Sequence, residues 1–335
     1  MFDNNHIYII AEAGVNHNGR LDLALQLCDD AKNAGADAVK FQTWKTEKIT
    51  TKNTIRAEYQ IKNTDVEQSQ FDMLKVLELS YDDFRIIKKH CEKIGIEFLS
   101  TPDEEDSLDF LLSLNLPFIK IGSGEITNIP YLRYIGSKKC PVVISTGMSY
   151  LGEVERAYNI LKGAGVPEIA VLHCTTNYPC PFEEVNLSAM QTLKNALKCT
   201  VGYSDHTLGI EVSVAAVAMG AKIIEKHFTL DTSMEGPDHA ASLAPEEFQL
   251  MVNSVRNIEK ALGDGIKRPN ASEKKISEVV LKKIVARKEI KKGELFSEDN
   301  ICVKRNFSGI EATLWDHVIG IKSRSDFQID QSITI

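Results

Sequence analysis

The sequence lacks the signals of a redox, zinc-binding, membrane-spanning or secreted protein. Its seven cysteines are scattered, and no two of them stand at C-x-x-C spacing. An odd and dispersed set of this kind indicates reduced thiols and a cytoplasmic location. No window reaches the run of about 18 apolar residues that a membrane-spanning helix needs. No basic segment precedes the first apolar residues, so we expect no signal peptide.

Excess positive charge and compact cofactor motifs are also missing. The 335 residues include 39 Lys and Arg against 47 Asp and Glu, which gives a net charge of −8. A nucleic-acid-binding protein usually presents a basic surface, so we expect no nucleic-acid partner. No G-x-G-x-x-G turn follows an apolar run and no H-E-x-x-H pair occurs, so we expect no organic cofactor.

The chain does contain eight short apolar runs rich in Ile, Val and Phe, with amphipathic helical segments between most of them. We predict strands at residues 7–12, 37–43, 96–101, 118–124, 141–147, 168–175, 200–206 and 222–228. Strands that alternate with helices form a parallel sheet. Eight such units indicate an α/β fold, a (β/α)₈ TIM barrel, and the alternative is a doubly wound open sheet.

The alternation of apolar runs and amphipathic helical segments ends after the eighth unit. We predict a barrel domain over residues 1–263, a polar linker over 264–280 and a small, mostly β domain over 281–335. The last part is near the size at which domains struggle to fold alone, so we expect it to pack on something else.

Polar residues end every predicted strand. In a barrel these ends meet at one rim, where active sites form, and the rest of the interior is packed with apolar side chains. In the eighth run Glu225 and His227 share one face, because side chains alternate along a strand. The expected rim residues include Glu12, Lys40, Gln42, Thr101, Lys120, Ser123, Ser145, His173, Ser204, Asp205, His206, Glu225 and His227.

Two histidines at the rim suggest a metal site. His206 and His227 end neighbouring strands, and two imidazoles with water or substrate oxygens suit Mn²⁺ or another first-row metal. A hydrogen-bonded pair of histidines explains the spacing equally well. Asp205 and Glu225 are candidates for orienting the histidines or for acting on substrate.

Two lysines at the rim suggest an anion site. Lys40 and Lys120 lie among the hydroxyls of Thr101, Ser123, Ser145 and Ser204, next to glycines that allow close backbone approach. A single lysine in a strand would usually extend to solvent, but two with these hydroxyls favour a cradle for phosphate and carboxylate. Asp238 follows the last strand in a Gly-Pro loop, where it either reaches the rim or caps the turn. Cys174 beside His173 is no nucleophile–base pair, since adjacent strand residues point to opposite faces.

Nine motifs occur in the order seen in bacterial sialic acid synthases. They are AEAGVNHNG, KFQT, STP, KIGSGE, STGM, HCTTNYP, GYSDHT, EKHFT and GPDHAASL, and ARKEIKKGELFSEDNICVKR resembles the antifreeze-like (SAF) domain of that family. The resemblance covers nearly the whole chain. It implies a synthase that condenses phosphoenolpyruvate with an N-acetylated hexosamine and releases phosphate by C–O cleavage.

The resemblance also implies roles for individual residues. Phosphoenolpyruvate would be held by Lys40, Thr101, Lys120, Ser123, Ser145 and Ser204. His206 and His227 would bind Mn²⁺, Mg²⁺ or Co²⁺, and Glu12, Gln42, Tyr178, Glu225 and Asp238 would meet the sugar or the attacking water. In the family the SAF domain covers the partner's barrel in a domain-swapped homodimer, and Arg305 matches the arginine that touches the N-acetyl group. Two departures stand out: Asn306 and Phe307 follow Arg305 where many relatives read Pro-Gly, and Asp103 replaces a phenylalanine after the third strand.

The identity of the acceptor stays open at this point. Members of the family make N-acetylneuraminate, N,N'-diacetyllegionaminate or pseudaminate, and GPDHAASL and KFQT look more like the first two. Outside the family, a deoxy-octulosonate or deoxy-heptulosonate type synthase would not explain the C-terminal segment. A non-catalytic glycan-binding barrel would be expected to have lost some of Lys40, Lys120, His206, Glu225 and His227.

Overall fold

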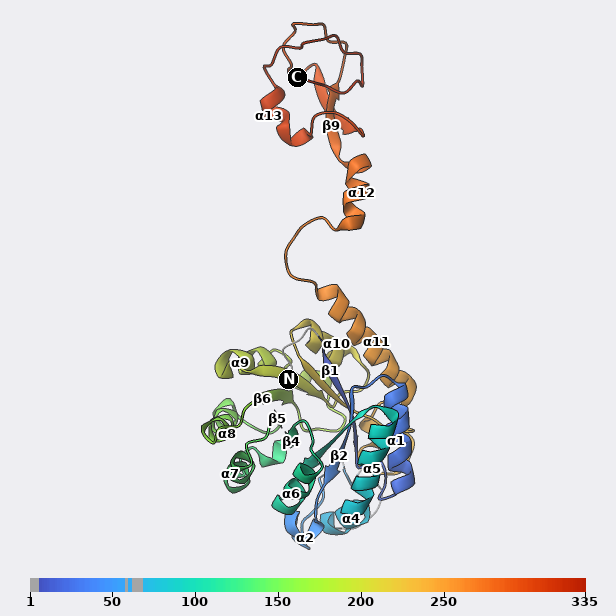
Figure 1. Ribbon diagram of the computed structural model, residues 1–335, viewed down its shortest axis with the longest axis vertical. Helices are drawn as coiled ribbons and strands as arrows, with labels where there is room; N and C mark the ends of the chain where they lie inside the picture. The colour runs from blue at the N-terminus through green and yellow to red at the C-terminus, as the bar shows by residue number, and fades with distance from the viewer. Residues whose placement is uncertain (1–5, 58–59, 62–68) are drawn as a thin grey trace. The chain divides into compact units, whose positions relative to one another are not determined.

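A computed structural model describes residues 6–57, 60–61 and 69–335 of the chain. The chain divides into two compact units, Met1–Gly263 and Asp264–Ile335, and each has its own apolar core. Figure 1 shows the helices and strands of both units. No helix in the described part of the chain combines the length and apolar character needed to cross a bilayer.

The first unit is a nearly closed barrel of parallel strands surrounded by helices (Figure 1). In the described residues the sheet has eight strands in the order β3-β2-β1-β8-β7-β6-β5-β4, and β3 also lies against β4. The strands are β1 (Tyr8–Gly14), β2 (Ala38–Thr43), β3 (Glu97–Pro102), β4 (Ile119–Ile121), β5 (Val142–Ser145), β6 (Ile169–Cys174), β7 (Thr200–Asp205) and β8 (Ile223–His227). The predicted (β/α)₈ barrel is confirmed.

The fourth strand is shorter than its sequence suggests. The apolar run 118–124 contains only β4, because the backbone turns into the short 3₁₀ helix η1 (Ser123–Glu125) directly after Gly122. This turn brings Ser123 back toward the barrel axis, where its hydroxyl oxygen accepts a hydrogen bond from the Gly147 backbone N–H at 3.0 Å.

The helices pack apolar faces against the outside of the barrel. Helix α5 shows the local logic: Ser80 and Asp83 form a capping box at its start, and Gly95 ends it with a left-handed φ of 74°. Its residues Phe84 and Ile87 are buried against the sheet. The other helices of this unit are α1 (Leu21–Asn33), α2 (Thr46–Ile49), α4 (Gln70–Leu77), α5 (Tyr81–Ile94), α6 (Glu105–Ser113), α7 (Ile129–Ser137), α8 (Leu151–Gly163), α9 (Ala189–Leu197), α10 (Glu211–Ala218) and α11 (Pro245–Leu262), with η2 (Phe182–Glu184) and η3 (His239–Ala241).

The barrel interior has an apolar layer below a polar one. The apolar cluster inside the strands consists of Ile10, Ala38, Leu99, Phe118, Val143, Ala170, Leu172 and Ile223, with Tyr8 packed against it. Two residues further along the same strand faces stand Glu12, Lys40, Thr101, Lys120, Ser145, Ser204 and Glu225. The apolar layer closes the bottom of the cavity that the polar layer lines.

The second unit begins with residues predicted as a linker, of which Ala271–Val280 form helix α12 without any buried side chain. Strands β9 (Lys282–Ala286) and β10 (Ile301–Arg305) pair antiparallel, and isolated bridges join β9 and the segment that follows it to later residues. Two short helices follow, η4 (Ala312–Leu314) and α13 (Trp315–Val318). The core of this unit consists of Ile284, Ala286, Ile290, Phe296, Ile301, Val318, Phe327 and Ile333.

Candidate functional site

A cavity of about 170 Å³ lies at the carboxyl ends of the strands. Eighteen residues line it, and every strand of the barrel contributes through its end or the segment that follows. Twelve of the predicted site residues are among them: Glu12, Lys40, Gln42, Thr101, Lys120, Ser123, Ser145, Tyr178, Ser204, His206, Glu225 and His227. The polar strand ends therefore converge on one enclosed space.

The two lysines form one buried network with two glutamates. Lys40 Nζ lies 2.6 Å from Glu12 Oε2 and 3.5 Å from Glu225 Oε2, and Lys120 Nζ lies 3.4 Å from Glu225 Oε1. Lys40 also donates a hydrogen bond to Thr101 Oγ1 at 3.1 Å. Lys40 and Lys120 are only 2% and 3% exposed, so neither side chain extends to bulk solvent. Both ammonium groups point into the cavity.

Burial and mutual attraction set the charges of this network. Burial alone would raise the pKa of Glu225, but the charges of Lys120 and Lys40 outweigh it and lower that pKa to about 2. Burial lowers the pKa of Lys120, whereas Glu12 and Glu225 overcome the effect of burial on Lys40 and raise its pKa. Burial raises the pKa of Glu12. The site thus holds one firmly ionised carboxylate between two lysines.

Hydroxyl groups line the wall next to the lysines. Ser204 donates a hydrogen bond to Glu225 Oε1 at 2.8 Å, and Ser123 lies 3.2 Å from Cys174 Sγ. The Ser145 hydroxyl is buried and has no hydrogen-bond partner among the described residues. A buried hydroxyl without a partner is costly in a folded protein, so this group is available to a ligand.

A glycine lets the backbone approach this wall. A Cβ atom at Gly147 would stand 2.0 Å from Thr176 Oγ1 and 3.0 Å from Ser123 Oγ. No side chain fits at that separation, so only glycine brings the backbone N–H of this position to Ser123.

The two histidines meet at the ends of β7 and β8, two residues beyond Ser204 and Glu225. The ring centroids of His206 and His227 are 5.3 Å apart, and the Tyr178 ring lies 4.2 Å from the first and 5.4 Å from the second. His206 Nδ1 donates to the Thr175 carbonyl at 2.6 Å, which leaves Nε2 unprotonated in the neutral ring. Burial lowers the pKa of both rings.

The protonation state of these two histidines suits a divalent metal ion. Both rings are neutral at pH 7, and His227 Nδ1 is buried without a hydrogen-bond partner among the described residues. Neutral imidazoles with a fixed tautomer are common metal ligands. In the described part of the chain no three His, Cys, Asp or Glu side chains cluster as a complete ligand set, so the pair offers two ligands and leaves other positions to oxygen atoms.

Other predicted residues lie outside the cavity lining. Asp238 reaches its edge, with Oδ2 4.0 Å from His227 Nδ1, and burial, followed by the charge of Glu12, raises its pKa to about 7. Arg305 ends β10 in the second unit and is exposed. The sequence interpretation was wrong for His173 and Asp205, since both point away from the barrel axis.

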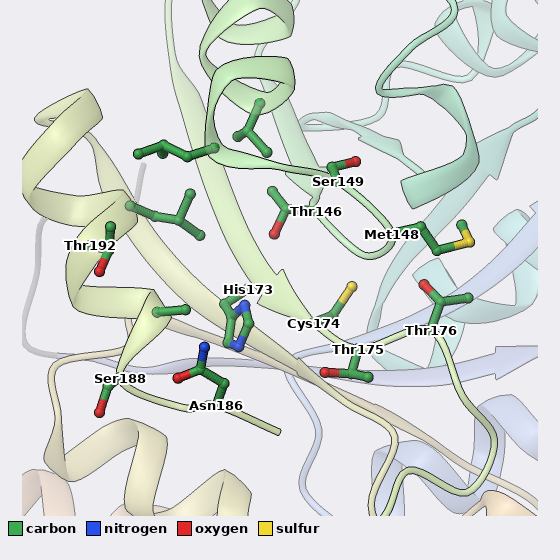
Figure 2. Close-up of a pocket in the computed structure, with 14 residues that line it drawn as sticks. Thr146, Met148, Ser149, His173, Cys174, Thr175, Thr176, Asn186, Ser188 and Thr192 are labelled. Carbon is green, nitrogen blue, oxygen red and sulfur yellow. The ribbon is translucent and has the colours of Figure 1, made fainter. Parts of the chain in front are cut away.

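His173 lines a neighbouring cavity of about 580 Å³, and its Nε2 donates a hydrogen bond to the Val185 carbonyl at 2.8 Å (Figure 2). Cys174 points the other way, into the site, as expected for adjacent residues in a strand. Figure 2 shows Met148, Cys174 and Thr176 on one side of this cavity, and the same three residues line the strand-end cavity.

Asp205 belongs to a polar network behind the histidines. Its carboxylate lies 3.0 Å from Lys226 Nζ and accepts hydrogen bonds from Thr207 and from Ser213 Oγ. Lys226 also donates to the Thr207 carbonyl. Asp205 and Lys226 are both fully buried, so this ion pair ties the ends of β7 and β8 together from the outside.

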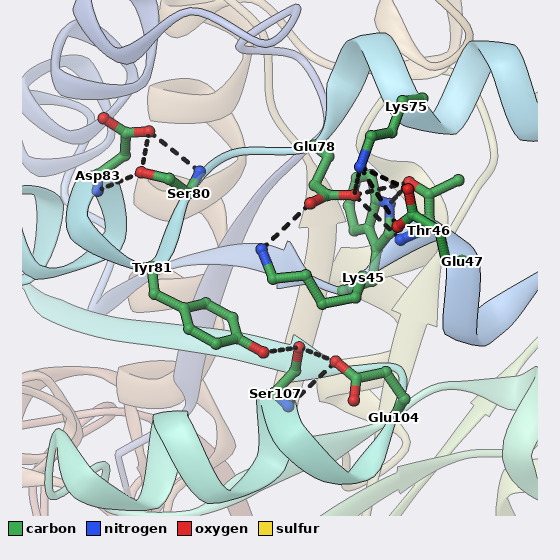
Figure 3. A network of polar contacts seen from close by, with 11 residues as sticks. Lys45, Thr46, Glu47, Lys75, Glu78, Ser80, Tyr81, Asp83, Glu104 and Ser107 are labelled. Carbon is green, nitrogen blue, oxygen red and sulfur yellow. Dashed lines mark hydrogen bonds and ion pairs between the residues drawn. The ribbon is translucent and has the colours of Figure 1, made fainter.

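Sequence reasoning missed a second network that supports the end of β2. Glu78 accepts hydrogen bonds from the Thr46 backbone N–H and hydroxyl and from Lys45, and it pairs with Lys75 (Figure 3). These bonds outweigh its burial and lower its pKa to about 2. The segment that follows β2 is thereby fixed to the C-terminal end of α4. A lone glutamate after a helix gives no signal of this in the sequence.

The fold and the cavity define the class of the molecule: a (β/α)₈-barrel protein with a small, charged ligand site at the strand ends. The model of the NeuB family matches residues 27–267, and the chain belongs to that family. This confirms the resemblance drawn from the nine motifs.

The chain is similar over most of its length to two named synthases and to one solved structure. It is 50% identical to N,N'-diacetyllegionaminic acid synthase of Campylobacter jejuni, over 97% of this chain and 98% of that protein. It is 46% identical to N,N'-diacetyllegionaminic acid synthase of Legionella pneumophila, over 98% and 93%. The crystal structure of a sialic acid synthetase from Leptospira borgpetersenii in complex with citrate superposes with a TM-score of 0.72 at 36% identity, covering 82% of this chain and 92% of that one.

Proposed function

We propose that the protein is a nonulosonate synthase that condenses phosphoenolpyruvate with 2,4-diacetamido-2,4,6-trideoxymannose to form N,N'-diacetyllegionaminate and phosphate. The observation that carries the proposal is that two buried lysines and two neighbouring buried histidines line one cavity. The names of the two relatives that match nearly the whole chain support the choice of acceptor.

The lysine side suits phosphoenolpyruvate. Its phosphate and carboxylate need fixed positive charge, which Lys40 and Lys120 supply in a site shielded from water. Ser123, Ser145, Thr101 and Ser204 add hydroxyl donors, and Ser145 has no other partner among the described residues. These groups are in place before the reaction starts, so no reorganisation is needed when charge moves in the transition state.

The histidine side suits the aldehyde of the open-chain sugar. His206 and His227 would hold Mn²⁺, Mg²⁺ or Co²⁺, and such an ion, when bound, stabilises negative charge on the aldehyde oxygen. Tyr178 packs against both rings and limits their movement. Glu12, Gln42 and Asp238 lie around this space and are the candidates for binding the sugar hydroxyls or the attacking water.

The bonds made and broken balance as follows. C3 of phosphoenolpyruvate bonds to the aldehyde carbon, whose oxygen takes a proton and becomes a hydroxyl. Water adds to C2, and the bond between C2 and the bridging oxygen breaks, so phosphate leaves with that oxygen. The water oxygen becomes the ketone oxygen, and its two protons end on the new hydroxyl and on phosphate. The lysines remain with the departing phosphate, and Glu225 stays ionised between them because of its low pKa.

The second unit completes the proposal. The resemblance of residues 286–305 to an SAF domain supports a domain-swapped homodimer in which Arg305 contacts the N-acetyl group in the partner's barrel. The seven cysteines, all free thiols, support a cytoplasmic location.

Phosphate release tests the proposed function. The purified protein with Mn²⁺ is given phosphoenolpyruvate together with 2,4-diacetamido-2,4,6-trideoxymannose, with N-acetylmannosamine, or with no sugar. We expect phosphate release and a nine-carbon keto acid by mass spectrometry, with the diacetamido sugar giving the higher kcat/KM. A preference for N-acetylmannosamine would instead identify an N-acetylneuraminate synthase. Absence of turnover with either sugar contradicts the proposal.

A further inference from the structure

Asp103 stands in the outer layer of the strand-end cavity. It follows β3 directly, and its backbone N–H donates to the Thr43 carbonyl at 3.1 Å, so the pairing of β2 with β3 continues up to it. It lies two residues beyond Thr101, as His206 lies two beyond Ser204 and His227 two beyond Glu225. Since side chains alternate along a strand, Asp103 shares a level with the histidines, above the lysines and hydroxyls.

Asp103 is also the one carboxylate in the cavity lining without a partner among the described residues. The other two carboxylates that line the cavity are Glu12, which pairs with Lys40 and accepts from Gln42, and Glu225, which pairs with both lysines. The side chain of Asp103 forms no hydrogen bond or ion pair with any residue in the described ranges. A partly buried carboxylate without a donor is unfavourable, so its position in the cavity points to a ligand that supplies one.

That ligand group is not phosphoenolpyruvate, because Asp103 in its ionised form repels phosphate and carboxylate groups. The remaining donors are N–H and O–H groups of the acceptor sugar. In the strand order β3-β2-β1-β8-β7-β6-β5-β4, β3 lies across the closed barrel from β7, which carries His206 at its end. An aldehyde at the histidines therefore directs the distal half of the sugar chain toward Asp103.

We propose that Asp103 determines acceptor specificity by accepting a hydrogen bond from the acetamido N–H on C4 of the sugar. This inference rests on the proposed function and adds the contact that recognises the second acetamido group. The 6-deoxy end of this sugar offers no donor of its own, so the C4 N–H and the C5 hydroxyl are the candidates at that end. The amide on C4 is the group that separates diacetamido from monoacetamido acceptors.

Steady-state kinetics of Asp103→Ala and Asp103→Asn at pH 8 test the contact, because burial raises the pKa of Asp103 to about 7 and its side chain is mostly ionised only above that pH. With the diacetamido sugar we expect the acceptor KM to rise about 10–100-fold for alanine, the effect of losing a hydrogen bond to a charged group. For asparagine we expect a smaller rise, because a neutral oxygen still accepts the bond. The KM for phosphoenolpyruvate should change by no more than about twofold in either variant. Asp82→Ala, a change at an exposed carboxylate on the outer helix α5, is the matched control and should leave both constants unchanged.

A comparison of two sugars on the wild-type protein and on Asp103→Ala identifies the sugar group that Asp103 contacts. The 4-deoxy sugar, 2-acetamido-2,4,6-trideoxymannose, should bind the wild-type protein as weakly as the diacetamido sugar binds Asp103→Ala. In that variant the 4-deoxy sugar should cause no further loss. Losses that simply add, or a rise in the KM for phosphoenolpyruvate alone, overturn the inference. If the wild-type protein turns over and the Asp103 variants match it, only this inference fails, whereas an inactive wild-type protein overturns the proposed function as well. Circular dichroism and thermal melting establish that each variant is folded.

Discussion

The barrel interior contains two layers of side chains that come from the same strands and point in the same direction but differ in polarity. In the lower layer Ile10, Leu99 and Leu172 belong to one buried apolar cluster. In the upper layer Lys40, Lys120 and Glu225 are equally buried but charged. Burial is therefore the same in both layers, and only the distance along the strand separates a packing residue from a functional one.

This difference in polarity means that the unfavourable free energy of burying charge is confined to the upper layer. A lysine or glutamate taken out of water is unfavourable unless its partners compensate it. Compensation stays incomplete at this end of the barrel. Among the described residues, Ser145 in the upper layer has no hydrogen-bond partner, and neither has the side chain of Asp103 one level above it. The lower layer is complete without a ligand. Substitutions in the two layers should therefore separate activity from stability.

Removal of one histidine should have the largest effect. His227→Ala takes away one of two proposed metal ligands, and we expect kcat/KM to fall by about 10³-fold or more, because a metal supplies several kcal/mol to the transition state. Chelation of the wild-type protein should have the same effect, and Mn²⁺ should restore the wild-type protein alone. Phosphate release provides the measurement. An unchanged rate in the variant would falsify the role given to this histidine.

Loss of one lysine should come next. Lys120→Met keeps most of the side-chain volume but removes the charge, and we expect kcat/KM to fall by about 10²–10³-fold. The effect should appear in the KM for phosphoenolpyruvate and in kcat, with the acceptor KM little changed. Lys194→Met, at an exposed position on α9, is the control. A variant that keeps full affinity for phosphoenolpyruvate contradicts the anion cradle.

A change in the lower layer should do the opposite. Leu172→Ala removes buried apolar volume from the floor of the barrel, and we expect the free energy of unfolding to fall by about 2–5 kcal/mol. Well below the melting temperature, kcat should stay within a few-fold of the wild type. Urea denaturation and phosphate release on the same samples give the two numbers. A loss of activity without a loss of stability would contradict the assignment of the lower layer to stability and the upper layer to activity.

The smallest effect should be a pH-dependent change in stability at Asp103. Burial, and then the charge of Glu125, raise the pKa of Asp103 to about 7, with Glu12 and Glu104 acting in the same direction and Lys40 against them. The folded protein thus keeps a proton that the unfolded chain releases near pH 4. The resulting stability is present at low pH and is lost as pH rises through about 7.

Asp103→Asn carries no such proton, so the variant should match the wild type near pH 4. Its melting temperature should exceed that of the wild type by a few degrees at pH 8, and the gain should develop between pH 4 and 7. Thermal melting across this range measures it. A difference that does not vary with pH would show that the carboxylate is solvated as in an ordinary surface residue.

The barrel and its polar rim could be predicted from the sequence because both depend on local periodicity. Apolar runs of six to eight residues mark the strands, and a polar residue at the end of each run marks the rim. The facing of Glu225 and His227 followed from the two-residue period alone. The outward direction of His173 is predictable in the same way, since Cys174 and His173 cannot share a face and only one of them can line the site.

Partners across the barrel could not be predicted. Lys40 pairs with Glu12 because β1 and β2 align these residues in register, and Glu225 reaches both lysines only when the barrel has closed. Asp205 looks like a rim residue in the sequence, yet it points outward to Lys226 because Ser204 and His206 take the inward positions. Register and closure are properties of the whole sheet, which no single segment contains.

The outward pair of Asp205 and Lys226 limits how the sequence of this protein can diverge. Each side chain is fully buried and neutralises the other, so a change at either position alone leaves a bare charge behind the histidines. We expect the two positions to be replaced together or not at all among proteins that keep this barrel. These two positions, which do not contact substrate, would then change in sequence as slowly as the positions that do.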